Sequence, residues 1–327
     1  MKVCYIGMCG HSGQVHETLR ALAKEDRVTF DAAFGDAKIT FSGAAPGSRE
    51  EALGRWFGDE MPYFSDYREM LDETKPELAV VSPVYGRTAS VILACARRGI
   101  HVIAEKPIAH TMEELSEVKQ AVRENGIRFT AMHFLRFEPA FQEAGQLVRA
   151  GRIGEVRLIT AQKSYKYGTR PAWFSDRSLY GGTIPWVGIH MIDMASWYTG
   201  KRYRTVRALQ YGSSEKACLM QYELEGEILA SMNLDYLRPQ GASTHGDDRI
   251  RIAGTEGVIE VRNDRIFLLD RDGEKEWTPA HTMDGPDLVR EFVYGRDPIP
   301  LEELYHITET AIRSQEAADS GELVRIG

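Results

Sequence analysis

The chain opens with Val3-Cys4-Tyr5-Ile6-Gly7-Met8-Cys9-Gly10-His11-Ser12-Gly13, a short apolar run that leads into a loop with three glycines. The residues that follow, from Glu17 to Lys24, have apolar side chains at helical spacing. Glycines let a backbone turn tightly and approach a phosphate, whose charge the N-terminus of the following helix attracts. The spacing is G-x-x-G-x-x-G, with Cys9 in the middle position, and alone it fits an ordinary turn equally well. Its place between a strand and a helix favours a dinucleotide-binding loop.

The rest of the first third repeats this strand-and-helix alternation. Four more apolar runs read as strands, and three stretches read as helices. The runs are 28–34, 78–81, 101–104 and 129–132, and the helices are 67–74, 89–98 and 112–124. Continuous apolar strands that alternate with helices are typical of a parallel sheet buried on both faces. We therefore predict a doubly wound α/β domain of the Rossmann type over residues 1–130.

From residue 131 the pattern changes to longer strands in which apolar and polar residues alternate. This is typical of an antiparallel sheet with one covered face. We predict a second, α+β domain over residues 131–327 with a large, open, mostly antiparallel sheet, and we expect its C-terminal helices to pack back on the first domain. The expected strands are 156–163, 205–211, 218–224, 228–236, 249–253, 258–262 and 266–270, and the expected helices are 186–198, 286–294 and 301–320.

Length and composition agree with two globular domains. The chain has 327 residues, a formal net charge of −8 and 43% hydrophobic residues, and its pI is about 5.7. An acidic chain lacks the basic surface that nucleic-acid binding needs. The N-terminal apolar run is too short for a signal peptide or a membrane span. The four cysteines form no C-x-x-C pair and read as buried thiols, so we expect a cytoplasmic protein that binds neither nucleic acid nor membrane.

An acidic residue about 20 positions after a glycine loop normally binds the ribose hydroxyls and repels a 2′-phosphate. Asp36, at the end of the second predicted strand, fits this role better than Asp31, which lies inside that strand. Asp36 favours NAD(H) over NADP(H), although Lys38 is close enough to accommodate a 2′-phosphate.

Two further motifs carry candidate chemistry. Glu105-Lys106-Pro107 follows a predicted strand at the sheet edge where ligands bind, and its lysine can stabilise a developing alkoxide. His190 and Asp193 are three residues apart, so they share one face of a helix. A histidine is a suitable base for an alcohol, and a neighbouring carboxylate can orient it. Without context, Glu105-Lys106-Pro107 also fits an ordinary strand-to-helix turn, and a lone H-x-x-D pattern favours a histidine of the core.

In their order along the chain, these motifs resemble the Gfo/Idh/MocA (glucose–fructose oxidoreductase, inositol dehydrogenase, rhizopine catabolism) family. The resemblance covers nearly the whole chain. The motifs are the glycine loop, Ser82-Pro83, Glu105-Lys106-Pro107, Arg136-Phe137-x-Pro139, Gly151-Arg152-Ile153-Gly154, Gly181-Gly182, His190-x-x-Asp193 and Gly254-Thr255-Glu256-Gly257.

The resemblance implies an NAD(P)-dependent dehydrogenase whose active site lies between the domains. Hydride would pass between the nicotinamide and a carbinol carbon of a sugar, polyol or related molecule. His190 would remove the hydroxyl proton, Lys106 would steady the oxygen, and Asp193 would hold His190 or bind a neighbouring hydroxyl. The open sheet would form a homodimer or homotetramer interface. The cofactor-binding residues would be Gly7, Cys9, Gly10, His11, Ser12, Gly13, Asp36, Ser82, Pro83, Glu105 and Lys106.

Three positions depart from the family pattern. Trp186 stands where an aspartate is frequent, four residues before the helix histidine, and Arg87 stands where a histidine is common. Cys9 is the third. We expect Trp186 and Arg87 to contact substrate, together with Tyr165 and Trp173 from a loop-like stretch. An interface or surface loop fits that stretch equally well.

Two other functions remain open from sequence. One is a non-catalytic NAD-binding regulator, which the replacement at Trp186 keeps in consideration. The other is a metal-dependent lyase or hydrolase that uses His190 and Asp193. The cluster His245-Gly246-Asp247-Asp248 could suggest a metal, but it lacks a helical histidine pair. We expect it to be a loop or subunit contact, and we assign no metal ligands.

Overall fold

The computed structural model describes residues 1–25, 28–30, 64, 66–211, 216–280 and 287–327. The chain forms two compact units, and each unit is assembled from separate stretches. The first unit contains Met1–Met132, Thr169–Gly181 and Asp287–Tyr305, and the second contains His133–Gly168, Gly182–Pro286 and His306–Gly327. No helix in the described part combines the length and hydropathy that crossing a membrane requires.

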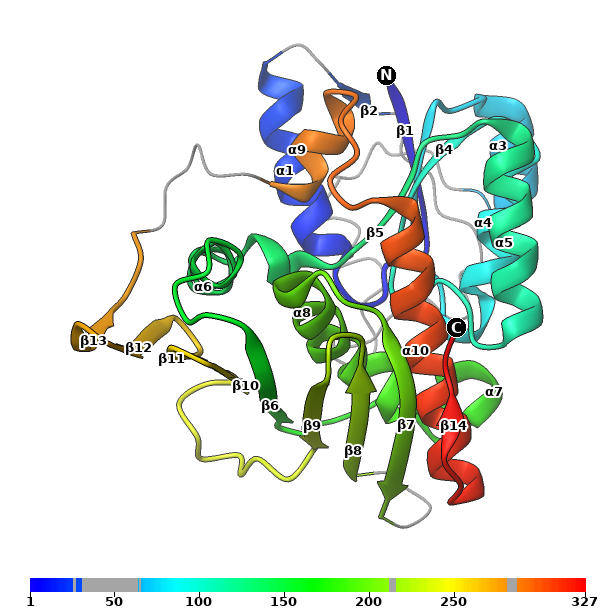
Figure 1. The fold of residues 1–327 in the computed structure, drawn as a ribbon. Coiled ribbons are helices and arrows are strands. Elements are labelled where there is room, and N and C mark those ends of the chain that lie inside the picture. The colour runs from blue at the N-terminus through cyan, green and yellow to red at the C-terminus, as the bar shows by residue number, and fades with distance from the viewer. Residues whose placement is uncertain (26–27, 31–63, 65, 212–215, 281–286) are drawn as a thin grey trace. The chain divides into compact units, whose positions relative to one another are not determined.

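The first unit contains a parallel sheet with the strand order β2-β1-β3-β4-β5. Strand β2 thus lies on one side of β1, and β3, β4 and β5 lie on the other side, as predicted for a doubly wound sheet. In Figure 1, α1 and α9 cover one face, and α3, α4 and α5 cover the other. The strands are β1 (Lys2–Ile6), β2 (Thr29–Phe30), β3 (Leu78–Val81), β4 (His101–Ala104) and β5 (Phe129–Ala131), and the helices are α1 (Ser12–Lys24), α3 (Tyr67–Thr74), α4 (Thr88–Ala96), α5 (Met112–Asn125) and α9 (Leu288–Val293).

Burial and capping explain these elements. Every residue of β3 is buried, which fits a strand with helices on both faces. Helix α5 begins where the Thr111 side chain accepts a hydrogen bond from the Glu114 backbone N–H, and it ends at Gly126, whose φ is +60°. Two short helical turns and a short helix complete the unit: η1 (Tyr85–Arg87), η3 (Ala172–Ser175) and α7 (Arg177–Tyr180).

The second unit is built on a nine-stranded sheet with the order β13-β12-β11-β10-β6-β9-β8-β7-β14. All described pairings are antiparallel except that of β6 with β9. The predicted fold class is confirmed. The strands do not follow one another in simple chain order, because β6 lies between β10 and β9. The strands are β6 (Val156–Tyr165), β7 (Tyr203–Gln210), β8 (Ala217–Leu224), β9 (Ile228–Asp235), β10 (Gly246–Gly254), β11 (Gly257–Arg262), β12 (Arg265–Asp270), β13 (Gly273–Trp277) and β14 (Val324–Arg325).

Helices cover one face of this sheet (Figure 1). Strand β8 alternates buried and exposed residues along its length, as one covered face requires. The Tyr222 hydroxyl of β8 lies 2.8 Å from the Ser314 hydroxyl of the last helix, so that helix packs on this face. The helical elements of the unit are η2 (Phe134–Phe137), α6 (Pro139–Arg149), a π-helical turn (Ile184–Gly188), α8 (Ile189–Thr199) and most of α10 (Leu301–Ser320).

Gly145 of α6 packs directly against two aromatic rings of α8. A Cβ at Gly145 would lie 2.7 Å from the Trp197 ring and 2.8 Å from the Tyr198 ring. Tyr198 cannot easily move, because it is buried and its hydroxyl donates a hydrogen bond to the Phe141 carbonyl at 2.7 Å.

We expect Gly145→Ala to destabilise the protein. Replacing glycine by alanine in a helix normally gains about 1 kcal/mol, whereas overpacking a core loses about 1–3 kcal/mol. The predicted net loss is about 1 kcal/mol in the free energy of unfolding, measured by urea denaturation. Gln146→Ala, on the exposed side of the same helix, is the control and should be nearly neutral. A Gly145→Ala protein more stable than the native one would contradict this packing.

Candidate active site

The glycine loop sits at the carboxyl end of β1, where the strand order of the first sheet reverses between β1 and β3. Open α/β sheets bind their ligands at such a switch point. Gly7 has a φ of +76°, and a Cβ on it would lie 2.4 Å from the Ser82 carbonyl oxygen and 2.5 Å from Pro83 Cα. Only glycine therefore allows this loop to contact the end of β3.

Hydrogen bonds fix the loop on Ser82. The Cys9 backbone N–H donates to the Ser82 carbonyl at 2.8 Å, and the Ser82 hydroxyl donates to the Cys9 carbonyl. The Cys9 side chain is fully buried. Cys9 therefore occupies the middle glycine position with its thiol inside the unit rather than over the loop.

The start of α1 fits a pyrophosphate. The first amides of a helix have no intrahelical partner and attract negative charge. His11 precedes the helix without a side-chain cap, and Gly10 has a φ of +66°. The Ser12 hydroxyl is buried and has no hydrogen-bond partner in the described part of the chain. A tight glycine turn, uncapped amides and an unused hydroxyl are together what a dinucleotide phosphate would use.

Asp36, together with Asp31 and Lys38, lies outside the described residues. The preference for NAD(H) that Asp36 indicates therefore stays a prediction.

Glu105 connects the glycine loop to the turn after β4. Its carboxylate is fully buried and accepts the His11 backbone N–H at 2.5 Å and the Lys106 backbone N–H at 2.9 Å. The His11 ring nitrogen Nδ1 lies 3.0 Å from Glu105 Oε1. Burial alone would raise the pKa of Glu105, but His11 and Lys106 outweigh it and hold that pKa below its ordinary value. The charged carboxylate thus orders both the loop and the turn.

Lys106 is 1% exposed and joined to Pro107 by a cis peptide bond. It directly follows the carboxyl end of β4, two strands from β1 in the same sheet. The structure therefore brings Gly7, Cys9, His11, Ser82, Pro83, Glu105 and Lys106 together at one edge of the first unit.

His190 and Asp193 share one face of α8 in the second unit, and both are buried. Asp193 contacts two residues that lie outside α8. Asp193 Oδ1 accepts from Arg136 Nε at 2.9 Å and from Nη2 at 2.6 Å, and Oδ2 lies 3.4 Å from His133 Nδ1. That Asp193 holds His190 or binds a neighbouring hydroxyl stays a prediction.

The charges around Asp193 keep it ionised. Burial would raise the pKa of Asp193, but Arg136 and His133 lower it below its ordinary value. Asp193 thus anchors the Arg136-Phe137-x-Pro139 motif to the helix that carries His190. Arg136 and His133 were not among the expected site residues. The Arg-Phe-x-Pro motif includes Arg136 and was the sequence signal for it, whereas His133 lies three residues before that motif.

The four predicted substrate residues are divided between the two units: Arg87 and Trp173 belong to the first, and Tyr165 and Trp186 belong to the second. Trp186 is buried in the π-helical turn that precedes α8, and Arg87 is exposed at the start of α4. Tyr165 is the last residue of β6 rather than part of a loop. It belongs to the second unit, whereas Trp173 belongs to the first.

Trp173 packs in an aromatic cluster of the first unit. Its ring centroid lies 4.8 Å from that of Tyr85 and 4.4 Å from that of Phe174, and Tyr180 completes the cluster. Gly86 allows this segment to come close, because a Cβ there would lie 2.0 Å from the Ser178 carbonyl oxygen. Trp173 therefore contributes to the packing of residues 169–181 within the first unit, and its contact with substrate stays a prediction.

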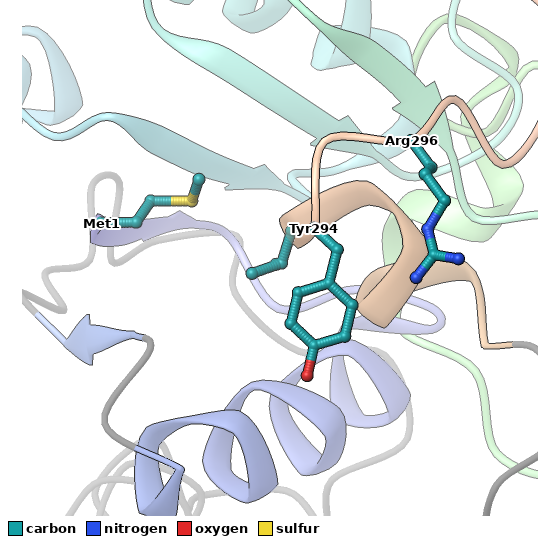
Figure 2. A pocket seen from close by; sticks show the side chains of 4 residues that line it. Met1, Tyr294 and Arg296 are labelled. Carbon is teal, nitrogen blue, oxygen red and sulfur yellow. The ribbon is translucent and has the colours of Figure 1, made fainter.

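A separate hollow of about 660 Å³ lies at the opposite end of β1 (Figure 2). It is lined by Met1, Val293, Tyr294 and Arg296. The Tyr294 hydroxyl donates to Glu25 at 3.1 Å. Because Met1 precedes β1 and the glycine loop follows it, this hollow is not the site of the predicted dinucleotide.

The segment His245-Gly246-Asp247-Asp248 is mainly strand rather than loop, because β10 begins at Gly246. Its carboxylates are paired with cations, Asp247 with Arg249 and Asp248 with Lys163. The described residues contain no group of three or more His, Cys, Asp or Glu side chains that could hold a metal ion.

We expect Asp193→Asn to lower the free energy of unfolding by about 3 kcal/mol at pH 7, because it leaves the Arg136 charge buried without its counter-ion. Since the folded-state pKa of Asp193 is depressed, its contribution is present above the unfolded pKa of about 3.9 and is lost as the pH falls through the folded value.

Urea denaturation at pH 7 and at pH 3 measures both effects. The native protein should lose stability between these pH values more steeply than the Asp193→Asn variant. Equal stability of the two proteins at pH 7, or an identical loss on acidification, would contradict the ion pair.

Sequence relatives of this chain are dehydrogenases. Inositol 2-dehydrogenase 2 from Saccharopolyspora erythraea is 31% identical over 210 residues, which is 64% of this chain and 56% of that protein. D-xylose 1-dehydrogenase (NADP(+)) 2 from Haloferax volcanii is 24% identical over 291 residues, 86% of this chain and 83% of that protein. The chain thus matches just over half of the length of the Saccharopolyspora enzyme.

A solved structure from Thermotoga maritima is similar over the full length of both chains, with a TM-score of 0.88 and 36% identity. The model of an oxidoreductase family with an NAD-binding Rossmann fold matches residues 1–133, and the GFO/IDH/MocA C-terminal domain matches residues 141–260. Because the two models together cover most of the chain, this protein belongs to the GFO/IDH/MocA oxidoreductase family.

Proposed function

We propose that this protein is an NAD(P)-dependent oxidoreductase that interconverts a CH–OH group and a carbonyl group on a sugar, polyol or related molecule. The observation that carries the proposal is the Glu105 carboxylate, which fixes the glycine loop through His11 and the backbone of Lys106 at once. One buried carboxylate thus holds both the predicted cofactor-binding loop and the turn that carries Lys106. This arrangement supports a reaction in which Lys106 acts beside the bound cofactor. The relatives named for inositol and xylose oxidation support the substrate class.

The role of each residue in the proposed reaction follows from the chemistry of its side chain. When bound, the nicotinamide supplies the carbon that accepts or returns the hydride. The Lys106 ammonium donates a hydrogen bond to the substrate oxygen and stabilises the negative charge that develops there. His190 takes the hydroxyl proton in oxidation and returns it in reduction. Asp193 acts as a positioning residue, because it holds Arg136 against the helix that carries His190.

The cofactor preference we propose is NAD(H), on the strength of Asp36 alone. A carboxylate at the end of the second strand accepts the ribose hydroxyls and repels a 2′-phosphate. The Haloferax volcanii relative is named for NADP(+), whereas scyllo-inositol 2-dehydrogenase (NAD(+)) from Bacillus subtilis is named for NAD(+), so relatives of both kinds exist.

We also propose a homodimer or homotetramer formed through the uncovered face of the second sheet. That face exposes leucines on four adjacent strands: Leu158 is 43% exposed, Leu229 is 55%, Leu219 is 57% and Leu209 is 66%. Leu158 pairs directly with Leu229, and Leu209 pairs with Leu219. The two pairs lie four residues apart along the strands, because Leu219 is opposite Asn233 and Leu229 is opposite Glu223. Large apolar side chains exposed on an uncovered sheet face support an interaction site there. The four cysteines, which are all buried and reduced, support a cytoplasmic location.

Replacing Lys106 by Met should abolish turnover while leaving cofactor binding largely intact. Loss of one donor to a developing oxyanion lowers kcat by about 10²–10³-fold. The assay is NADH absorbance in a screen of sugars and polyols, and NADH binding is measured by calorimetry. Lys24→Met, which removes an exposed lysine of the same unit, is the control. Undiminished kcat in Lys106→Met would remove Lys106 from the mechanism.

Leu219→Glu should weaken assembly of the protein, because it places a charge in one of the two leucine pairs on that face. Sedimentation velocity of the native chain should show a dimer or tetramer, and the variant should shift toward the monomer without a change in melting temperature. A native protein that is monomeric at micromolar concentration would contradict the proposed interface.

A further inference from the structure

Residues 169–181, which we call the strap, belong to the first unit, although the chain on both sides of them belongs to the second. Glycines with positive φ mark the two ends of the strap: φ is +61° at Gly168, +79° at Gly181 and +119° at Gly182. A Cβ on Gly168 would meet no atom within 4 Å, so packing does not restrict the backbone there. The chain can therefore change direction at the ends of the strap at little steric cost.

Aromatic side chains hold the middle of the strap on the first unit. The ring centroid of Tyr85, which is 1% exposed, lies 4.8 Å from that of Trp173 and 6.1 Å from that of Phe174. The helical pieces of the strap, η3 and α7, have only four residues each. Helices this short are not stable in water by themselves. The structure of the strap therefore depends on its contacts with the rest of the first unit.

The last residue of the strap packs on the ring of His110. A Cβ on Gly181 would lie 1.8 Å from His110 Nδ1 and 2.1 Å from Cε1, so any larger residue would displace the ring. Both ring nitrogens of His110 are shielded from solvent, and neither makes a well-aligned hydrogen bond to the described residues. A charge on such a ring would lose its hydration without compensation, so the docked strap favours the neutral imidazole.

The charged and polar groups around this ring come from three elements. Glu114 of α5 accepts the His110 backbone N–H at 2.7 Å, Arg177 belongs to α7 of the strap, and the Tyr85 backbone belongs to η1. Burial is the largest influence and lowers the pKa of His110 below its ordinary value. Arg177 acts in the same direction, whereas Glu114 and the Tyr85 backbone oppose it.

The direction of this effect sets the pH at which docking weakens. Once the strap leaves, water hydrates the ring of His110, and its pKa returns to about 6.5. The contribution of the neutral ring to docking is therefore fully present above about pH 6.5 and is lost progressively as the pH falls below that value. A charged ring also repels the Arg177 guanidinium of the strap.

We propose that the strap is a pH-sensitive device, which stays docked on the first unit while His110 is neutral and is released when protonation charges the ring under Gly181. Release separates Trp173 from Tyr85 and leaves the parallel sheet folded. The device needs neither a dinucleotide nor a substrate.

Hydrogen–deuterium exchange of the full chain, read by mass spectrometry and corrected for the intrinsic pH dependence of exchange, tests the proposal. Protection of residues 170–180 should fall at least fivefold between pH 7.5 and pH 5.5, whereas protection of β3 should not change. An NMR titration of the His110 ring should have the same midpoint as this loss of protection.

His110→Gln keeps a polar side chain but cannot titrate, so its strap should show equal protection at the two pH values. His101→Gln is the matched control, because His101 lies in the same unit and its pKa is also lowered, by burial and by Arg128. This control should keep the pH dependence of the native strap. If His110→Gln fails to fold, the comparison of the two midpoints in the native protein decides.

Equal protection of the native strap at both pH values, a parallel loss of protection in β3, or different midpoints would overturn the proposal. So would a pH dependence that a folded His110→Gln protein retains. Because exchange is measured without NAD(H) and without turnover, a chain with no oxidoreductase activity would contradict the proposed function and leave this inference standing.

Discussion

Close contact between the backbone at Gly7 and the Ser82-Pro83 turn is the constraint on which the first unit depends. A side chain at position 7 would collide with backbone atoms of residues 82 and 83, which cannot yield without moving β3. That contact places the glycine loop at the point where the strand order reverses. The amides of α1 and the Ser12 hydroxyl then face the same sheet edge as the turn that carries Lys106.

Three buried carboxylates also position elements of the two units, and each of them does so through a partner side chain. Glu105 with His11 orders the glycine loop, Asp193 with Arg136 anchors the helix of His190, and Asp248 with Lys163 joins β10 to β6. An ionised group is retained in a low-dielectric interior only when a partner and hydrogen bonds compensate its lost hydration. In each pair the two residues are at least 57 positions apart in the sequence, so each pair joins distant segments of one unit.

Local pattern was enough to predict much of the fold. Apolar runs marked the strands β3 and β4, and alternation marked β7 to β12, because side-chain burial repeats with the geometry of each element. Helix 67–74 was predicted with its observed bounds. The glycine loop and Glu105-Lys106-Pro107 were recognisable because they need particular residues at particular backbone positions.

Pairings between segments that are distant in the sequence could not be predicted from local pattern. The spacing places Asp193 on the same helix face as His190, but nothing in the local sequence indicates the ion pair that Asp193 forms with Arg136. The parallel pairing of β6 with β9 depends on how the chain returns to the sheet. Strand β13 was missed because its exposed Glu-Lys-Glu sequence has no apolar alternation, and Tyr165 was assigned to a loop although it ends β6.

The measurement that tests the central claim most directly is a calorimetric titration of the native chain with NADH and NADPH. The geometry of the glycine loop predicts saturable binding of one dinucleotide per chain, tighter for NADH. It also predicts that Gly7→Val abolishes this binding, because the side chain would separate the loop from Ser82. Absence of binding for both dinucleotides, or undiminished binding by a folded Gly7→Val protein, would contradict the account.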